Sequence, residues 1–243
     1  MKCSIGKLVA GDLLAESVHS EPAELNELLQ TLLFSQLFAN LKSGSSGKFD
    51  SPGTWWSSYD NAMLHTHWSL LDNRNRTFKP KSTSTLGINA LLEEFLLPQL
   101  ASAQTQDIRQ LLTQMTRLPT TDPLAMQFQT HVLKMPDRRN GHSTIALQIG
   151  VLESATQRAS LSATFSTSKA VGTSLLSQTF TGSQIVGDIH VRFTRYAWDP
   201  ASYRKGTEEH PSPRSHVLDF LAGAQDRLIL AIPCEVTDGA DQA

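Results

Sequence analysis

Two histidines separated by one residue, His65 and His67, are the best candidates for metal ligands in this sequence. Apolar and polar residues alternate from Ala62 to Leu70, which predicts a strand, and residues two apart in a strand point to the same side. Both imidazoles would then reach one divalent ion such as Zn or Fe, as in a metal-dependent enzyme. A third ligand would have to come from elsewhere in the chain. The alternative is that the two histidines are polar residues on the solvent-exposed face of a strand.

Common catalytic motifs are missing from the sequence. It has no GxxxxGK[ST] phosphate loop, no GxGxxG, no GxSxG nucleophile elbow, no HExxH and no EF-hand loop. These absences disfavour several enzyme classes. The leading hypothesis is therefore a non-catalytic binding or assembly subunit without a cofactor, and the metal-dependent enzyme is the alternative.

Basic residues gather locally although the formal net charge is only −2. The segment 73–92 holds four basic residues and no acid, and the segment 190–205, HVRFTRYAWDPASYRK, interleaves arginine with aromatic residues. Guanidinium groups pair with phosphates, and aromatic rings stack on unpaired bases, so single-stranded RNA or DNA is an expected partner. The alternative is a strand whose aromatic residues enter the core while its arginines face water. The expected nucleic-acid contacts are Arg74, Arg76, Lys79, Lys81, Arg192, Arg195, Tyr196, Tyr203, Arg204 and Lys205.

Two further patterns concern partners. Trp, Tyr and Arg dominate the energetics of protein interfaces, so the aromatic residues of 55–59 and 196–203 favour a protein partner or self-association. Strands from Ser143 to Thr181 are small and polar on one face and apolar on the other. Such strands occur in ordinary half-exposed hairpins, and also in self-assembling or membrane-active β-hairpin proteins, which is the second alternative.

The apolar periodicity indicates which elements position these residues. Helices are expected over 22–41, over 85–118 with a break at Pro98, and over 211–224. Strands are expected over 62–70, 126–134, 144–152, 159–168, 187–198 and 227–236, with 144–152 and 159–168 forming a hairpin. This order predicts an α+β fold with a mostly antiparallel sheet from the C-terminal half and a helical layer from the N-terminal half. The chain is expected to be one domain over 1–243, helix-rich in 1–120 and strand-rich in 121–237.

Composition and cysteine content suggest a location. The 243 residues are 40% hydrophobic and 18% charged, which is typical of a globular protein. Lys7 and Asp12 interrupt any apolar signal segment, and no stretch is long and apolar enough to span a membrane. Cys3 and Cys234 lie near opposite ends without a CxxC motif, which makes a disulfide framework unexpected but leaves a single bond between them open. A cytoplasmic protein without membrane contact is therefore expected.

Overall fold

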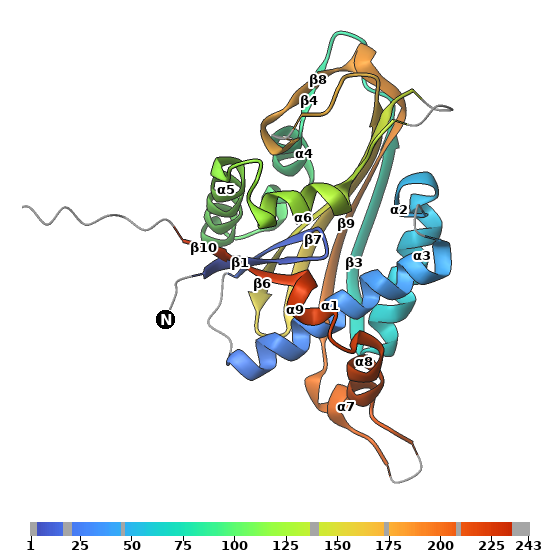
Figure 1. Cartoon of the computed structure of the whole chain (residues 1–243), viewed down its shortest axis with the longest axis vertical. Helices are drawn as coiled ribbons and strands as arrows, with labels where there is room; N and C mark the ends of the chain where they lie inside the picture. Colours follow the sequence, from blue (N-terminus) through green and yellow to red (C-terminus); the bar gives the residue numbers. More distant parts are fainter. Residues whose placement is uncertain are drawn as a thin grey trace, which may run out of the picture.

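The computed structural model describes residues 4–16, 21–44, 47–136, 141–172, 175–207 and 210–234. Its centre is an 8-stranded sheet in the order β10-β1-β2-β6-β7-β9-β3, with β5 beside β6 (Figure 1). All neighbouring strands are antiparallel except β2 and β6, which are parallel. The strands are β1 (Ser4–Val9), β2 (Asp12–Glu16), β3 (Trp68–Phe78), β5 (Leu133–Lys134), β6 (Ser143–Ser154), β7 (Gln157–Thr167), β9 (Ile185–Trp198) and β10 (Ile229–Pro233).

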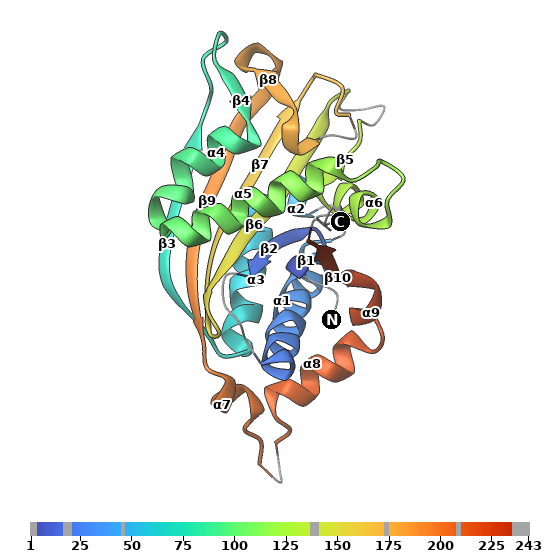
Figure 2. The ribbon, with the colours of Figure 1, turned by 90° about the vertical axis from the view of Figure 1, so that its left-hand side faces the viewer.

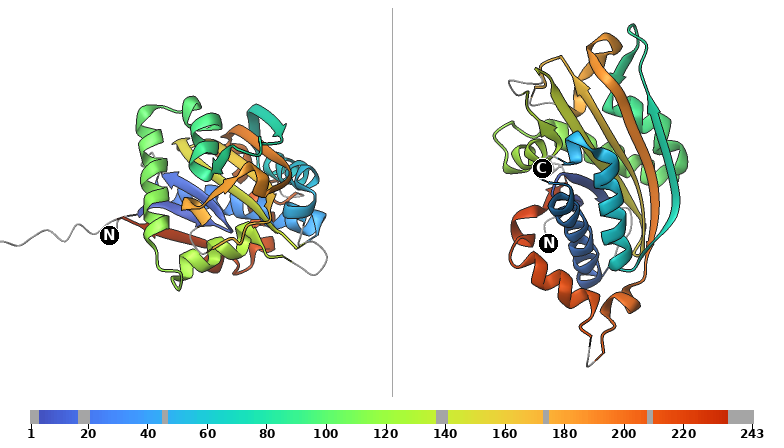
Figure 3. Two further views of the ribbon diagram at one scale, coloured as in Figure 1. Left: turned by 90° about the horizontal axis from the view of Figure 1, so that it is seen from above. Right: turned by 90° about the vertical axis from the view of Figure 1, so that its right-hand side faces the viewer.

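Helices cover both faces of this sheet. Figure 2 shows α4, α5 and α6 in front of it, and the right-hand view of Figure 3 shows α1 and α3 on the opposite face. The first group comprises α4 (Ile88–Phe95), η1 (Leu97–Gln99), α5 (Ser102–Arg117) and α6 (Pro123–Val132). The second comprises α1 (Pro22–Ser43), α2 (Gly47–Asp50), α3 (Pro52–His65), α8 (Pro213–Leu221) and α9 (Gln225–Leu228), whereas α7 (Pro200–Arg204) lies beyond the end of β9. A two-stranded sheet of β4 (Thr85–Gly87) and β8 (Thr179–Thr181), with η2 (Leu175–Ser177) and η3 (Gly182–Gln184), completes the described structure.

The predicted fold class is confirmed, since the chain combines helices with a mostly antiparallel sheet. Two features were not foreseen. The helices form a layer on each face rather than a single layer, and the N-terminal half supplies β1, β2 and β3 to the main sheet.

The two faces of the central strands differ in polarity. Alternate residues of β6 and β7, including Ile149, Leu161 and Phe165, are buried in one apolar cluster beneath α4, α5 and α6. The residues between them face α1 and α3 and are mostly small or polar, as the Ser/Thr-rich alternation predicted. Ser160 of β7 and Thr194 of β9 share a buried hydrogen bond of 2.9 Å on this side. The expected hairpin of 144–152 and 159–168 is present as β6 and β7.

The predicted strand over Ala62–Leu70 is wrong for its first half. α3 continues to His65, His67 adopts a positive φ of 62°, and β3 begins only at Trp68. The reason is a helical stripe of buried residues, Trp55, Tyr59, Ala62 and Met63, in a helix that starts with a proline. This longer pattern outweighs the short alternation that follows it.

The predicted strand over Met126–Lys134 is also mostly wrong. α6 occupies 123–132, and only Leu133–Lys134 pairs with β6. Asp122 caps this helix, because its Oδ1 atom accepts a 2.8 Å hydrogen bond from the backbone N–H of Leu124, and Pro123 occupies the first turn. These start signals outweighed the alternating pattern.

The single disulfide bond that the sequence left open bears on the cysteines. Cys234 is disulfide-bonded, whereas Cys3 lies outside the described residues. The low cysteine count therefore gives no support to a reducing compartment. In the described ranges, the structure has no helix with the length and apolar character that a membrane span requires.

Candidate interaction site at the β3 edge

β3 is an edge strand of 11 residues. It pairs with β9 on one side, and within the described residues no strand pairs with its other side. We call this outer side of Trp68–Phe78 the β3 edge. Apolar Leu70 and Leu71 are 43% and 54% exposed there, and Leu64 at the end of α3 is 67% exposed. An edge strand presents unpaired backbone N–H and C=O groups, which can pair with another strand.

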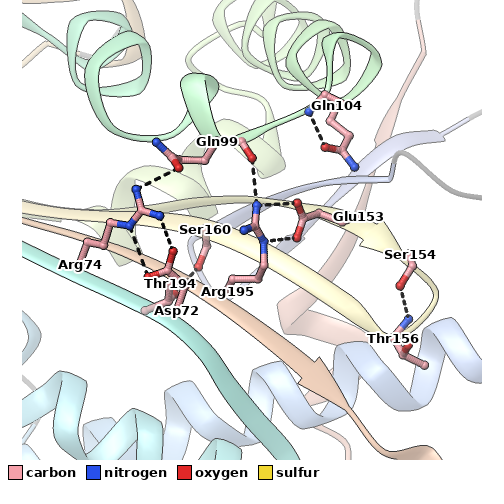
Figure 4. A network of polar contacts seen from close by, with 11 residues as sticks. Asp72, Arg74, Gln99, Gln104, Glu153, Ser154, Thr156, Ser160, Thr194 and Arg195 are labelled. Carbon is pink, nitrogen blue, oxygen red and sulfur yellow. Dashed lines mark hydrogen bonds and ion pairs between the residues drawn. The ribbon is translucent and has the colours of Figure 1, made fainter.

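A hydrogen bond and an ion pair tie the two arginines of β3 to the helices on one face. Arg74 donates to Asp72 Oδ2 at 2.7 Å and to Gln99 Oε1 at 3.0 Å, and Arg76 pairs with Glu94 (Figure 4 for Arg74). The two arginine side chains therefore point toward the helices on this face rather than past the edge. This arrangement leaves the backbone of the edge accessible.

Arg195 of β9 belongs to the same network. Its guanidinium lies between the Glu153 carboxylate, with contacts of 2.7 and 2.9 Å, and the Gln99 carbonyl oxygen at 2.9 Å (Figure 4). The hydrogen bonds that Arg195 donates to the Glu153 carboxylate raise the pKa of Arg195. The side chain is therefore a fixed cation with its charge already balanced.

On the opposite face of β3, Arg192 and Asp60 form the second network. Both terminal nitrogens of Arg192 donate to the Asp60 carboxylate, at 2.9 and 2.6 Å, and its Nε atom donates to Asn73 Oδ1 at 3.1 Å. The Tyr196 hydroxyl also donates to Asp60 Oδ1. Burial, together with Asp60, raises the pKa of Tyr196, so this hydroxyl stays protonated. A cleft of about 480 Å³ opens beside this network, between α3 and the strands β3 and β9.

The structure does not gather the predicted nucleic-acid residues into one surface. Lys79 and Lys81 follow the end of β3 that pairs with Ile189, whereas α7 follows the other end of β9, at Trp198. The aromatic members Tyr196 and Tyr203 are only 2% and 0% exposed.

The remaining basic members near α7 are Arg204 and Lys205, both exposed. Arg204 donates to Glu27 Oε2 at 2.7 Å and also lies 3.6 Å from Glu24. Arg192 and Arg195 point to opposite faces of the sheet, as their partners on α3 and η1 show. The ten residues therefore fall into separate groups rather than one phosphate-binding track.

The geometry expected for a metal pair is not present at His65 and His67. His65 ends α3, and His67 lies in the turn before β3, so the two residues do not alternate along one strand. Across the described ranges, no group of three or more His, Cys, Asp and Glu residues is placed to hold a metal ion.

Sequence reasoning missed a buried cluster of charged residues under α3. Asp12 of β2 and Arg158 of β7 form an ion pair with both residues 0% exposed, and the Tyr59 hydroxyl lies 3.3 Å from Arg158 Nη1. Lys48 is 8% exposed, and burial lowers its pKa to about 8. Burial also raises the pKa of Tyr59 to about 12. A charged residue inside an apolar strand, such as Asp12 in LVAGDLLA, was the only local signal of this cluster.

Comparisons with known proteins assign no family to the chain. No family model and no curated protein matches the chain. A solved structure described as a delta-endotoxin is similar over 78% of this chain and 83% of that chain, with 12% sequence identity and a TM-score of 0.41. At that TM-score the likeness carries no inference about function.

Proposed function

We propose that this protein is a non-catalytic assembly subunit that pairs with a second copy of itself through the β3 edge. The observation that carries this proposal is the exposed edge of an 11-residue strand at one margin of the sheet. Pairing two such edges would satisfy the outward backbone groups of both strands and join the two sheets.

The sequence of β3 is self-complementary when it is paired antiparallel about its central residue, Asn73. Asp72 of one copy then lies opposite Arg74 of the other, twice, and Trp68 lies opposite Phe78, so all 11 residues overlap. Opposite charges directly across a strand pair stabilise it by about 0.2–1 kcal/mol each. The exposed Leu70 would cover the aliphatic part of Arg76 of the partner copy.

Features of the strand favour this register over indiscriminate pairing. β3 has a register irregularity between Leu70 and Asp72, and two arginines follow it. Bulges and charges on an edge strand discourage non-specific aggregation. The order of charges along β3 then favours the register in which Asp72 of one copy lies opposite Arg74 of the other.

Single-stranded nucleic acid stays a prediction as the alternative partner. The aromatic residues expected to stack on bases are buried, and the arginines of β3 and β9 already contact carboxylates. Those contacts favour the protein-partner version, in which the ion pairs stay in place.

Light scattering coupled to size exclusion tests the proposal. We expect a mass of twice 26.7 kDa that returns to one chain mass in Arg74→Glu, because the new carboxylate would face Asp72 of the other copy. The double variant Asp72→Arg, Arg74→Glu should restore the dimer, since the charges are exchanged but still complementary.

A matched control is Arg109→Glu, which makes the same charge change on the exposed surface of α5. It should leave the mass unchanged. A wild-type protein of one chain mass at all concentrations, or a dimer that persists in Arg74→Glu, would refute pairing through the β3 edge.

A further inference from the structure

The cleft between α3 and the sheet is lined mainly by polar side chains that the fold holds in place. Its walls are the first turns of α3, with Trp56 and Asp60, and the residues of β3 and β9 that face them. Its volume of about 480 Å³ lies within the range of roughly 300–1,000 Å³ that is usual for small-ligand sites.

Hydrogen bonds within the walls fix which atoms remain for a ligand. Asn73 Oδ1 accepts from Arg192 Nε, which orients the Asn73 amide so that its nitrogen is left to donate. Thr77 Oγ1 lies 3.1 Å from His190 Nδ1, so the second ring nitrogen of His190, Nε2, remains available to hydrogen-bond a ligand. Asn75 lines the cleft with a further amide, which both donates and accepts. The cleft therefore presents an array of donors and acceptors.

The charges inside the cleft cancel. The Arg192 side chain is only 5% exposed, and both of its terminal nitrogens donate to the carboxylate of Asp60, whose side chain is 30% exposed. An anionic ligand would meet the Asp60 carboxylate, and a cationic one would meet the guanidinium. A purely apolar ligand would cover the amides of Asn73 and Asn75 without offering them hydrogen-bond partners, which is unfavourable for polar groups. The array therefore suits a neutral ligand rich in hydroxyl groups.

Trp56 supplies the apolar part of such a site. The guanidinium carbon of Arg192 lies 5.8 Å from the centroid of the Trp56 ring, which fixes the indole against the polar network. An aromatic surface beside amides and a neutralised carboxylate matches a pyranose ring, which has C–H groups on its faces and hydroxyls at its edges. We propose that this cleft binds a neutral saccharide.

The saccharide site is independent of the β3 edge. It uses side chains on the α3 face of β3, whereas the strand pairing uses the outward backbone groups. Loss of the dimer in Arg74→Glu would test the assembly alone, because Arg74 lies on the opposite face and contacts Gln99.

Tryptophan fluorescence gives a direct test with glucose, galactose, mannose and N-acetylglucosamine as probes. Three of the four tryptophans, Trp55, Trp68 and Trp198, are at most 4% exposed, so Trp56 is the one that a ligand can reach. We expect a saturable change with at least one sugar, and we expect Trp56→Phe to abolish it. Calorimetry on the wild type and Trp56→Phe shows whether the variant has lost sugar binding or only the fluorescence change.

Asn75→Ala is the decisive variant, because Asn75 is exposed and its truncation leaves the Arg192–Asp60 network intact. It should weaken sugar binding about tenfold, the effect of about one lost hydrogen bond. Asn89→Ala on α4, which also truncates an exposed asparagine, should leave sugar binding unchanged. The proposal fails if no sugar gives a saturable signal, if Asn75→Ala binds like the wild type, or if inorganic phosphate binds in place of the sugars.

Discussion

Removing the guanidinium of Arg158 is predicted to destabilise the fold strongly. Arg158→Met keeps most of the aliphatic stem but leaves the Asp12 carboxylate, which is 0% exposed, without its ion-pair partner. Breaking a buried ion pair from one side typically costs about 3–5 kcal/mol, because an uncompensated charge remains. Lys48 offers a partial replacement, since its charge also favours the ionised form of Asp12, so we expect the lower part of that range.

Urea unfolding followed by circular dichroism measures this loss. Asp12→Asn alone should also destabilise, but the double variant Asp12→Asn, Arg158→Met should lose less than the sum of the two, with a coupling of about 2 kcal/mol or more. Arg109→Met makes the same side-chain change in an ion pair whose members are 60% and 57% exposed, and it should cost less than about 1 kcal/mol. An Arg158→Met variant within 1 kcal/mol of Arg109→Met would refute the reasoning.

The pH dependence of Arg158→Met provides a second readout of the same perturbation. Burial acts to raise the pKa of Asp12, and Arg158 and Lys48 act against it. Burial outweighs these charges, so the pKa of Asp12 already lies above its ordinary value of 3.8 in the wild type, and without Arg158 the folded state should hold the proton to a still higher pH. Its stability should therefore be largest below the ordinary value and fall as the pH rises through the folded pKa. In Arg158→Met this fall should extend to a higher pH than in the wild type, and a profile parallel to that of the wild type would contradict an unpaired carboxylate.

Three further predictions concern separate features of the fold. Burial lowers the pKa of Lys48 from 10.5 to about 8, so between these values the unfolded chain keeps a proton that the folded one loses. Stability should rise with pH across this window by up to about 3 kcal/mol, and Lys48→Met should remove that rise in urea unfolding. Cys234→Ser should cost about 2–5 kcal/mol, and a reducing agent should destabilise the wild type but not the variant. Gly182→Ala should lower the melting temperature, because the added Cβ would collide with the carbonyl oxygen of Lys81 at a cost of about 1–3 kcal/mol.

Local patterns predicted the long elements and failed where two periods overlap. α1, α5 and the β6–β7 hairpin follow from apolar spacing sustained over many residues. The segment Ala62–Leu70 contains the last turn of a helix and the first residues of a strand, so its alternation of apolar and polar residues did not indicate one element. At Met126–Lys134, the cap and the proline at the helix start carried more information than the alternation.

Long-range pairing explains why the candidate site was less predictable than the fold. Asp12 and Arg158 are 146 positions apart in the sequence, and nothing local shows that they meet. Arg192 and Arg195 were expected to contact nucleic acid, but in the fold they pair with Asp60 and Glu153, which come from other elements. The basic character of the segment 190–205 in the sequence is therefore balanced in the fold by acids that lie far away along the chain.

The pairing of these arginines with carboxylates affects which partner the β3 edge would bind. A nucleic acid would have to displace carboxylates from the arginines, and it would leave Glu153, whose side chain is 13% exposed, without its cation. A second β3 strand has no such cost, because it binds through the backbone while Arg192 and Arg195 keep their partners. The ion pair of Arg192 with Asp60 and the hydrogen bond of Arg195 to the Gln99 carbonyl instead hold β9 against α3 and η1, and β9 in turn supports β3 along ten residue pairs. An edge held rigid before it meets its partner loses little conformational entropy on pairing, so the closed charge network favours assembly over binding to phosphates.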